Sequence, residues 1–214
     1  MDVIDLTHVI TEDMPVYPGS EPPSLRPVAL HGADGYRETR LSLHSHTGTH
    51  IDPPAHILAD GATLDRFPAD RFVGRALVID CRGAREGGEI TRAHIEAYGD
   101  SAHSADFLLF WTGWDALWGT PGYYAGYPCL SADAVDCILE GSHKGLGFDV
   151  MSPDPVGSTE LPRHKRLLGA GLILIENLCG LAMCGREPFL FAGLPLRVLA
   201  SDGAPARCVA MVGT

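Results

Sequence analysis

The sequence has few basic residues and no long apolar run. Its 214 residues include 16 lysines and arginines against 27 aspartates and glutamates, which gives a formal net charge of -11. This charge makes nucleic acid or an anionic membrane surface a poor partner, although a small anionic substrate remains compatible with it. No apolar stretch is long enough to span a bilayer, so we expect no membrane association.

The sequence also has no closely paired cysteines, and we expect no leader segment. Its six cysteines are scattered without a CxxC pair, and its first residues, MDVIDLTHVI, have no basic segment of the kind a secretory signal carries. We therefore expect reduced, mostly buried thiols and a cytoplasmic protein. With 45% hydrophobic residues and no internal repeat, the sequence predicts one globular domain over residues 1–214.

Short apolar runs alternate with helix signals through the middle of the chain. Buried strands are predicted at residues 75–81, 107–110, 145–150 and 172–176. Helices are predicted after the N-cap residues Thr91 and Ser131 and over residues 161–168. Two more strands are predicted at residues 194–199 and 207–212, around a turn at Asp202-Gly203, whereas residues 12–35 are expected to be irregular. This alternation indicates a mixed α/β domain.

A histidine-rich segment carries most of the recognisable chemistry. It has the pattern H-x-G-T-H-x-D-x-P-x-H between His46 and His56. His46, His50 and Asp52 have the same parity, so an extended backbone would direct all three to one face. Two imidazoles and a carboxylate on one face form a typical set of ligands for a divalent transition metal. The segment therefore predicts a metal site.

Isolated histidines carry much less information than this segment. A single HxxxH pair arises easily by chance, but seven specified positions in one string do so far less often. We expect His44, just outside the string, to be structural or to support a ligand. We expect five other histidines to be ordinary surface or core residues: His8, His31, His94, His103 and His143.

The sequence resembles the cyclase-like metal hydrolases, a family that includes bacterial kynurenine formamidase and isatin hydrolase. The resemblance extends over nearly the whole chain, and the segment from His46 to His56 is its signature. Further matching segments are PVYPG at 15–19, TGW at 112–114, GFDVMSPDP at 147–155 and HKRLLGAGLILIENL at 164–178. The resemblance implies a three-layer α/β fold of the swivelling β/β/α type and a homo-oligomer, either a homodimer or a homotetramer.

The resemblance also implies roles for individual residues. His46, His50 and Asp52 would bind one divalent metal, and His164 and Glu176 would join Asp52 at a second. Spacing alone would have favoured an interaction with a helix dipole or a buried ion pair for His164 and Glu176. Zinc is the first expectation and manganese the second, with one or two ions per chain, because imidazole and carboxylate ligands suit both metals.

His56 would exchange protons with the reacting groups. Pro53 and Pro54 separate it from the ligands, and an imidazole pKa near neutrality suits it to protonate a leaving amine. The alternative is that His56 is a further ligand of the same metal.

These residues predict hydrolysis of an amide, formamide or cyclic amide of a small molecule by metal-activated water. Two other functions remain open: a lactone hydrolase or cyclase of the same family, and a non-catalytic metal-binding protein of the same fold. The substrate is expected to contact Tyr17, where kynurenine formamidases carry Trp. A tyrosine is smaller and adds a hydroxyl, which favours a smaller or more polar substrate than N-formylkynurenine.

Overall fold

Four parallel strands form the middle of one sheet. The computed structural model describes residues 1–84 and 86–213. The parallel strands, in spatial order, are β5 (Val73–Asp80), β7 (Phe107–Trp111), β9 (Gly145–Phe148) and β10 (Ile173–Glu176). All four were predicted within a few residues, because strands buried on both faces have nearly continuous apolar sequences.

Antiparallel strands extend this sheet at both edges and close it. On one side β5 pairs with β11 (Phe189–Pro195), which pairs with β12 (Ala204–Val212). On the other side β10 pairs with β4 (His50–Asp52), and β4 returns to pair with β12. The sheet is therefore barrel-like, with β1 (Asp2–Asp5) added beside β12.

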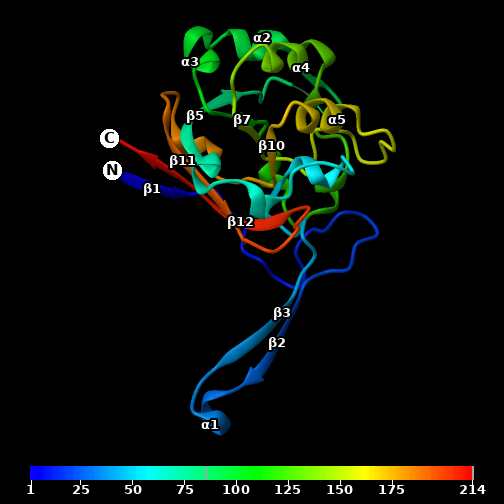
Figure 1. Ribbon diagram of the computed structural model, residues 1–214, viewed down its shortest axis with the longest axis vertical. Coiled ribbons are helices and arrows are strands. Elements are labelled where there is room, and N and C mark those ends of the chain that lie inside the picture. Colours follow the sequence, from blue (N-terminus) through cyan, green and yellow to red (C-terminus); the bar gives the residue numbers. More distant parts are fainter. Residues whose placement is uncertain (85, 214) are drawn as a thin grey trace.

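Helices cover one outer face of this barrel, as Figure 1 shows. The longer helices are α2 (Arg92–Glu96), α3 (Gly99–His103), α4 (Ala132–Leu139) and α5 (Pro162–Gly169). Thr91 and Ser131 are the N-caps of α2 and α4, as predicted. Strands β6 (Glu89–Ile90) and β8 (Cys129–Leu130), which precede α2 and α4 in the sequence, form a small two-stranded sheet. One-turn 3-10 helices lie at Pro54–His56, Leu64–Arg66, Ala69–Phe72, Trp114–Leu117, Pro121–Tyr124 and Leu181–Cys184.

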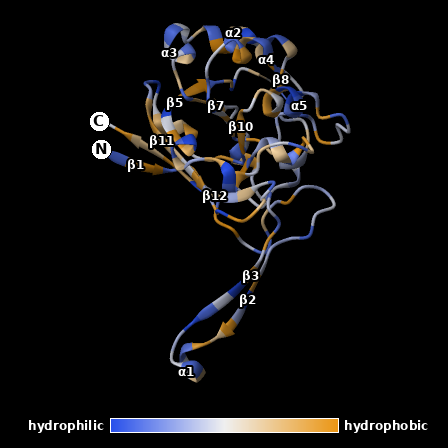
Figure 2. Ribbon diagram, in the orientation of Figure 1, coloured by the Kyte–Doolittle hydropathy of each residue, from blue (hydrophilic) through white to orange (hydrophobic). Residues whose placement is uncertain are grey.

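Alternate residues of the strands serve two separate cores. Leu108 and Phe110 of β7 pack in the core under the helices, whereas Phe107 and Leu109 point into the barrel. Figure 2 shows the apolar residues concentrated in these strands. The two walls of the barrel and the helical layer make the three layers that the sequence predicted. The cysteines are free and mostly buried, as expected.

Two predictions of secondary structure, at residues 194–199 and 12–35, are wrong. The strand expected at residues 194–199 is β11, which begins at Phe189 and ends at Pro195. Proline has no N–H for the ladder, and the apolar residues after it, such as Leu196 and Leu199, are exposed. The segment 12–35 is also not wholly irregular, because it contains the strand β2 (Ser24–Ala29) and the short helix α1 (His31–Asp34).

Strand β2 pairs with β3 (Glu38–Ser42) to form a hairpin that projects away from the barrel. We refer to residues 24–42 as the arm; it is the extension at the bottom of Figure 1. The chain between the arm and the barrel is not a continuous strand, because β3 ends at Ser42 and β4 begins at His50. Across the described part of the chain, every helix is too short or too polar to cross a bilayer.

Candidate metal centre

Two neighbouring strands supply the centre of the site. In the antiparallel pairing of β4 with β10, His50 lies opposite Glu176 and Asp52 lies opposite Leu174. Ile51, between the two β4 residues, points into the barrel core. Since side chains alternate along a strand, His50, Asp52 and Glu176 share the other face, and all three are buried. His50 Nε2 lies 3.2 Å from Asp52 Oδ1 and 3.4 Å from Glu176 Oε2.

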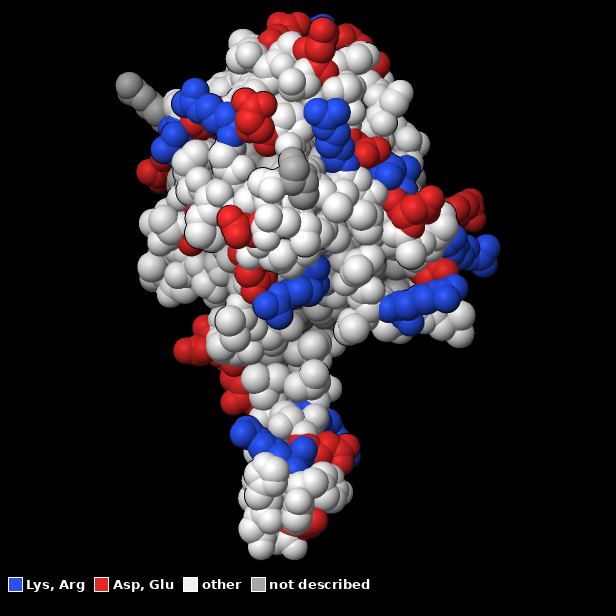
Figure 3. Space-filling model, turned by 90° about the vertical axis from the view of Figure 1, so that its left-hand side faces the viewer, with Lys and Arg blue, Asp and Glu red and all other residues white. Residues whose placement is uncertain are grey.

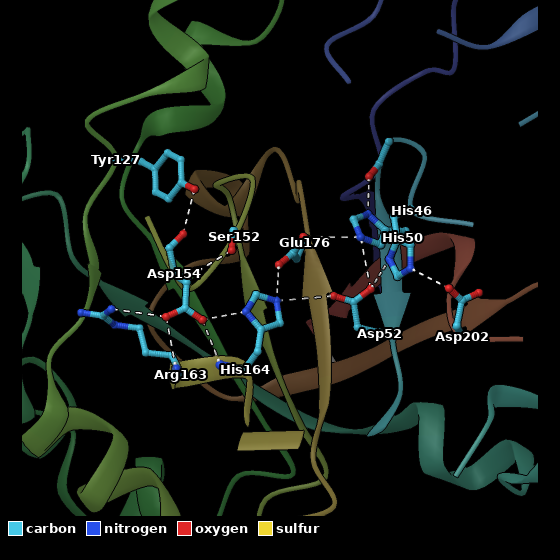
Figure 4. Close-up of polar contacts among 11 residues, drawn as sticks. His46, His50, Asp52, Tyr127, Ser152, Asp154, Arg163, His164, Glu176 and Asp202 are labelled. Carbon is cyan, nitrogen blue, oxygen red and sulfur yellow. Dashed lines mark hydrogen bonds and ion pairs between the residues drawn. The ribbon is translucent and has the colours of Figure 1, made fainter. Parts of the chain in front are cut away.

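His164 reaches the same place from α5. Its Nε2 lies 3.3 Å from Glu176 Oε1 and 4.0 Å from Asp52 Oδ2, as Figure 4 shows. Its other ring nitrogen, Nδ1, donates a hydrogen bond to Asp154 Oδ2 at 2.8 Å. The structure thus brings together His164, Glu176 and Asp52, which are far apart in the sequence.

His46 joins the cluster from a turn rather than from a strand. Its Nδ1 lies 2.7 Å from Asp52 Oδ1, so the two side chains are in contact. The extended backbone that we invoked is wrong for this residue, because Gly48 takes a φ of 64° between His46 and β4. A side chain at Gly48 would be strained there and would approach Met14 Cε to 2.9 Å.

The cluster has the chemistry of a divalent metal site. Within the described residues, Asp52 Oδ2 and Glu176 Oε1 are buried carboxylate oxygens that receive no hydrogen bond. Such oxygens are costly to bury without a compensating charge. Ligand atoms of His50, Asp52 and Glu176 all lie within 4.8 Å of one another, as do those of His46, Asp52 and His56. Imidazole nitrogens and carboxylate oxygens at this spacing fit zinc or manganese.

Each of three histidines uses its second ring nitrogen in a fixed contact. Those partners are the Gly48 carbonyl for His50 Nδ1 at 2.8 Å, Asp154 for His164 Nδ1, and Asp202 Oδ2 for His46 Nε2 at 3.4 Å. Ligating histidines in metal sites commonly hold their rings in this way, which leaves the other nitrogen free to bind the metal. The orientation of the imidazoles is therefore set by the chain itself.

The charged side chains of the cluster strongly shift one another's pKa values. Burial lowers the pKa of His50, but Asp52 and Glu176 together raise it to about 9. Burial likewise opposes protonation of His164, yet Asp154, Glu176 and Asp52 raise its pKa to about 10. For Asp52, burial raises the pKa while His50 and His46 hold it well below its usual value. Burial and the charge of Asp52 both raise the pKa of Glu176.

His56 lies beside the ligands and faces the cavity. It ends the 3-10 turn that follows Pro53, as the two prolines predicted. Its ring centroid is 4.0 Å from that of His46 and 5.9 Å from that of His164. Burial lowers the pKa of His56 to about 4, with a smaller lowering from the neighbouring histidines and an opposing effect of Asp52. This pKa is lower than the near-neutral value expected from the sequence, because the ring is buried; the imidazole is neutral at pH 7 and able to accept a proton.

A cavity of about 350 Å³ opens over the cluster. His46, His50, His56, His164 and Glu176 form its polar floor. Its other wall is mainly apolar and comes from residues 15–17, Met151, Pro155 and Leu161. Tyr17 is part of this wall and is 47% exposed, and its contact with a substrate stays a prediction.

Several supporting residues were not predicted from the sequence. Asp154 lies in a segment that resembled the family, but nothing local marked it as the partner of His164. Asn177 holds a left-handed backbone with a φ of 57° and donates from Nδ2 to the Gly48 carbonyl at 2.9 Å. Asp202 appeared only as a turn residue. His44 is exposed, and no hydrogen bond of its side chain is found among the described residues, so it does not support a ligand.

Comparison with known proteins gives the same family. The family model described as "Putative cyclase" matches residues 4–155. The chain belongs to this cyclase family. A kynurenine formamidase of Salinibacter ruber is 31% identical over 213 residues, covering 98% of this chain and 97% of that protein.

Solved structures of the family agree with this assignment. A potential metal-dependent hydrolase with cyclase activity is 29% identical, with a TM-score of 0.80 over 98% of this chain and 96% of that one. Isatin hydrolase A from Labrenzia aggregata, at 24% identity, shares the fold with a TM-score of 0.87 over 99% and 93% of the two chains. The protein is thus a metal-dependent hydrolase of the cyclase family, with a candidate metal site in place.

Proposed function

We propose that the chain hydrolyses a carbon–nitrogen bond in a small amide, formamide or cyclic amide. The observation that carries the proposal is the convergence of five proposed ligands, two of which have a buried carboxylate oxygen without a hydrogen bond, beside a cavity lined by four of these residues and by His56. A non-catalytic metal site does not need a neutral imidazole beside it. The related protein named kynurenine formamidase supports a formamide or similar amide as the substrate class.

Three side chains would hold each of two metal ions. His46, His50 and Asp52 would hold one, and His164, Glu176 and Asp52 the other, since a carboxylate has two oxygens and can serve both. A divalent cation bound there lowers the pKa of water to about 7 and polarises a carbonyl group. Zinc is proposed before manganese, and a cytoplasmic location agrees with six free cysteines.

His56 would move the proton that the reaction requires. Because the pKa of His56 is lowered to about 4, its ring nitrogen is unprotonated at pH 7 and can take a proton from the attacking water. The same nitrogen would then donate this proton to the leaving nitrogen as the carbon–nitrogen bond breaks. The products are a carboxylic acid and an amine, and His56 returns to its neutral form.

Tyr17 would select among amides. Its ring offers a flat apolar surface, and its hydroxyl can bind a polar group of the substrate or water. A site that binds such a polar group penalises substrates without it. We therefore propose that N-formylkynurenine is not the best substrate, and that Tyr17→Trp shifts preference toward it.

A substrate screen with the metal-loaded protein tests this function. The screen should contain aryl formamides, cyclic amides, esters and lactones, with kcat/KM measured for each. Faster hydrolysis of amides than of lactones supports the proposal, and faster lactone hydrolysis or cyclisation assigns the related chemistry instead. No turnover of any of these substrates by fully metallated protein would indicate a metal-binding protein without catalytic function. N-formylkynurenine as the best substrate would refute the argument from Tyr17.

A further inference from the structure

Asn177 belongs to a group of polar residues that solvent hardly reaches. On the face drawn in Figure 3, charged side chains of both signs lie mixed at the surface, where water screens their interactions. Asn177, Thr49, His50 and Tyr123 are, in contrast, at most 6% exposed. A hydrogen bond lost among buried residues leaves a polar group without a partner, so the contacts of Asn177 constrain the geometry around it.

The backbone turns sharply at Asn177, directly after Glu176, the last residue of β10. Asn177 has a φ of 57°, in the left-handed region that asparagine tolerates better than most residues. In a continuing strand, residue 177 would point to the opposite face from Glu176. Asn177 instead lines the same cavity as Glu176. The turn thus brings its side chain to the side of the metal centre.

All four polar atoms of Asn177 contact other parts of the chain. Its side-chain Nδ2 donates to the Gly48 carbonyl at 2.9 Å, and its Oδ1 accepts from the Tyr123 hydroxyl at 2.7 Å. Its backbone N–H donates to the Val150 carbonyl at 3.0 Å, and its carbonyl accepts from the Thr49 hydroxyl at 2.6 Å. The end of β10 is therefore tied through this one residue to three other segments.

Tyr123 fixes which way round the amide of Asn177 lies. A backbone carbonyl only accepts hydrogen bonds, so the atom that faces Gly48 is the amide nitrogen. The amide oxygen then faces Tyr123, and the phenol supplies the hydrogen. Burial raises the pKa of Tyr123 well above its usual value, which keeps this proton on the hydroxyl. The ring of Tyr123 packs on Trp118, with the two ring centroids 4.9 Å apart.

The Gly48 carbonyl accepts two hydrogen bonds at once. One comes from Asn177 Nδ2, and the other comes from His50 Nδ1 at 2.8 Å. Donation from Nδ1 places the hydrogen of the neutral imidazole on that nitrogen, which leaves Nε2 free to bind a metal. His50 Nε2 faces Asp52 and Glu176 in the cluster. A displaced Gly48 carbonyl would therefore turn the ring of a proposed ligand.

The turn that carries His46 also depends on Asn177. Strands β4 and β10 pair only as far as His50 and Glu176, so residues 46–49 lie beyond their ladder. On the β10 side, that turn is held by its two hydrogen bonds with Asn177. These contacts fix the place from which His46 reaches the cluster.

We propose that Asn177 is a positioning residue of the metal centre, which sets the ring of His50 and the turn of His46 by holding Gly48 and Thr49. The proposal rests on the metal centre proposed above and is independent of which amide is the substrate. Tyr123 has the second part of the role, because its hydroxyl holds the Asn177 amide in the orientation that binds Gly48. Asn177 and Tyr123 are not themselves ligands.

Asn177→Gly tests this role, because it removes the amide and keeps the left-handed backbone, which glycine adopts without strain. The dissociation constant for Zn²⁺, measured by chelator competition, should rise by about 10–100-fold. Co²⁺ bound in place of zinc reports the ligand geometry, so its visible absorption spectrum should change in position and intensity. A residue that only stabilised the fold would lower the unfolding temperature and leave the cobalt spectrum of the folded protein unchanged.

Tyr123→Phe is an independent variant, because it leaves the Asn177 amide in place and removes the hydrogen bond that orients it. Its Zn²⁺ affinity should fall by about 10-fold, the lower end of the same range. Tyr98→Phe is the matched control, since the Tyr98 hydroxyl accepts the Asp80 N–H at 2.9 Å but does not line the cavity. The control should bind Zn²⁺ as the wild type does. Circular dichroism checks that each variant is folded.

The results separate the positioning role from the metal centre itself. Zn²⁺ affinity within twofold of the wild type and an unchanged cobalt spectrum in both Asn177→Gly and Tyr123→Phe overturn the positioning role and leave the metal centre standing. An equal loss of affinity in Tyr98→Phe overturns it as well. If Asn177→Gly does not fold, Tyr123→Phe decides alone. Wild-type protein that binds no divalent ion overturns the metal centre of the proposed function, and the positioning role with it.

Discussion

Replacing Asp154 by Asn should weaken metal binding although Asp154 is not a proposed ligand. Its Oδ2 accepts hydrogen bonds from His164 Nδ1 at 2.8 Å and from the His164 backbone N–H at 3.0 Å. Its Oδ1 accepts from the Arg163 backbone N–H at 3.1 Å. An asparagine has one oxygen and one NH₂ group in place of the two oxygens. In either orientation its NH₂ group therefore faces an N–H donor, from His164 or from the Arg163 backbone.

The size of the effect follows from this mismatch. Loss of a carboxylate that holds a metal-binding histidine typically reduces metal affinity by about 10–100-fold, equivalent to about 1.4–2.7 kcal/mol. A buried donor left without an acceptor also costs about 1–3 kcal/mol of the free energy of unfolding. Metal affinity and thermal stability should therefore both fall in Asp154→Asn.

Chelator competition measures the metal dissociation constant, and calorimetry measures the unfolding temperature. Asp65→Asn is the matched control, because Asp65 also accepts a backbone hydrogen bond, from Ala200 N–H at 3.1 Å, but is only partly buried and does not line the cavity. The control should retain the wild-type metal affinity. If Asp154→Asn is less stable yet binds metal within twofold of the wild type, the role of Asp154 in orienting His164 is refuted.

Three further variants separate the roles of single residues. His56→Ala should keep its metal and turn over roughly 10²–10⁴-fold more slowly; a metal-free variant would make His56 a ligand. Glu176→Gln should lower the metal content, measured by mass spectrometry, by about one ion per chain, and unchanged content would remove the support for a second ion. Burial lowers the pKa of His8 from 6.5 to about 4, so His8 takes up a proton in the unfolded chain at a higher pH than in the folded chain. The free energy of unfolding therefore falls as the pH is lowered from 6.5 to about 4. In the presence of chelator, His8→Phe should flatten this dependence while keeping the stack on Trp118, and an equal slope in both proteins would contradict the assignment.

The central strands and helices were predictable because their sequences carry local signals. β5, β7, β9 and β10 are apolar on both faces, and Thr91 and Ser131 mark helix starts. The arm had no comparable signal, since most of its side chains are exposed. The start of β11 at Phe189 was missed because the apolar residues after Pro195 resembled a strand but lie at the surface.

The metal centre was predictable to the extent that it is local in sequence. His46, His50 and Asp52 lie within seven residues and share one pattern. His164 and Glu176 required the family resemblance, because α5 and β10 bring them to β4 only in the folded chain. The partners of the histidine rings, Asp154 and Asp202, depend on tertiary approach and had no sequence pattern of their own.

The metal content of Asp52→Ala, compared with that of the wild type, tests the central claim most directly. Asp52 contacts His46 and His50, its Oδ2 lies 4.0 Å from His164 Nε2, and it would be a ligand of both proposed metal ions. The wild type should contain one or two divalent ions per chain, and a folded Asp52→Ala protein should contain none and have no amidase activity. Full metal occupancy in folded Asp52→Ala, measured by mass spectrometry, would contradict a metal centre built on this residue.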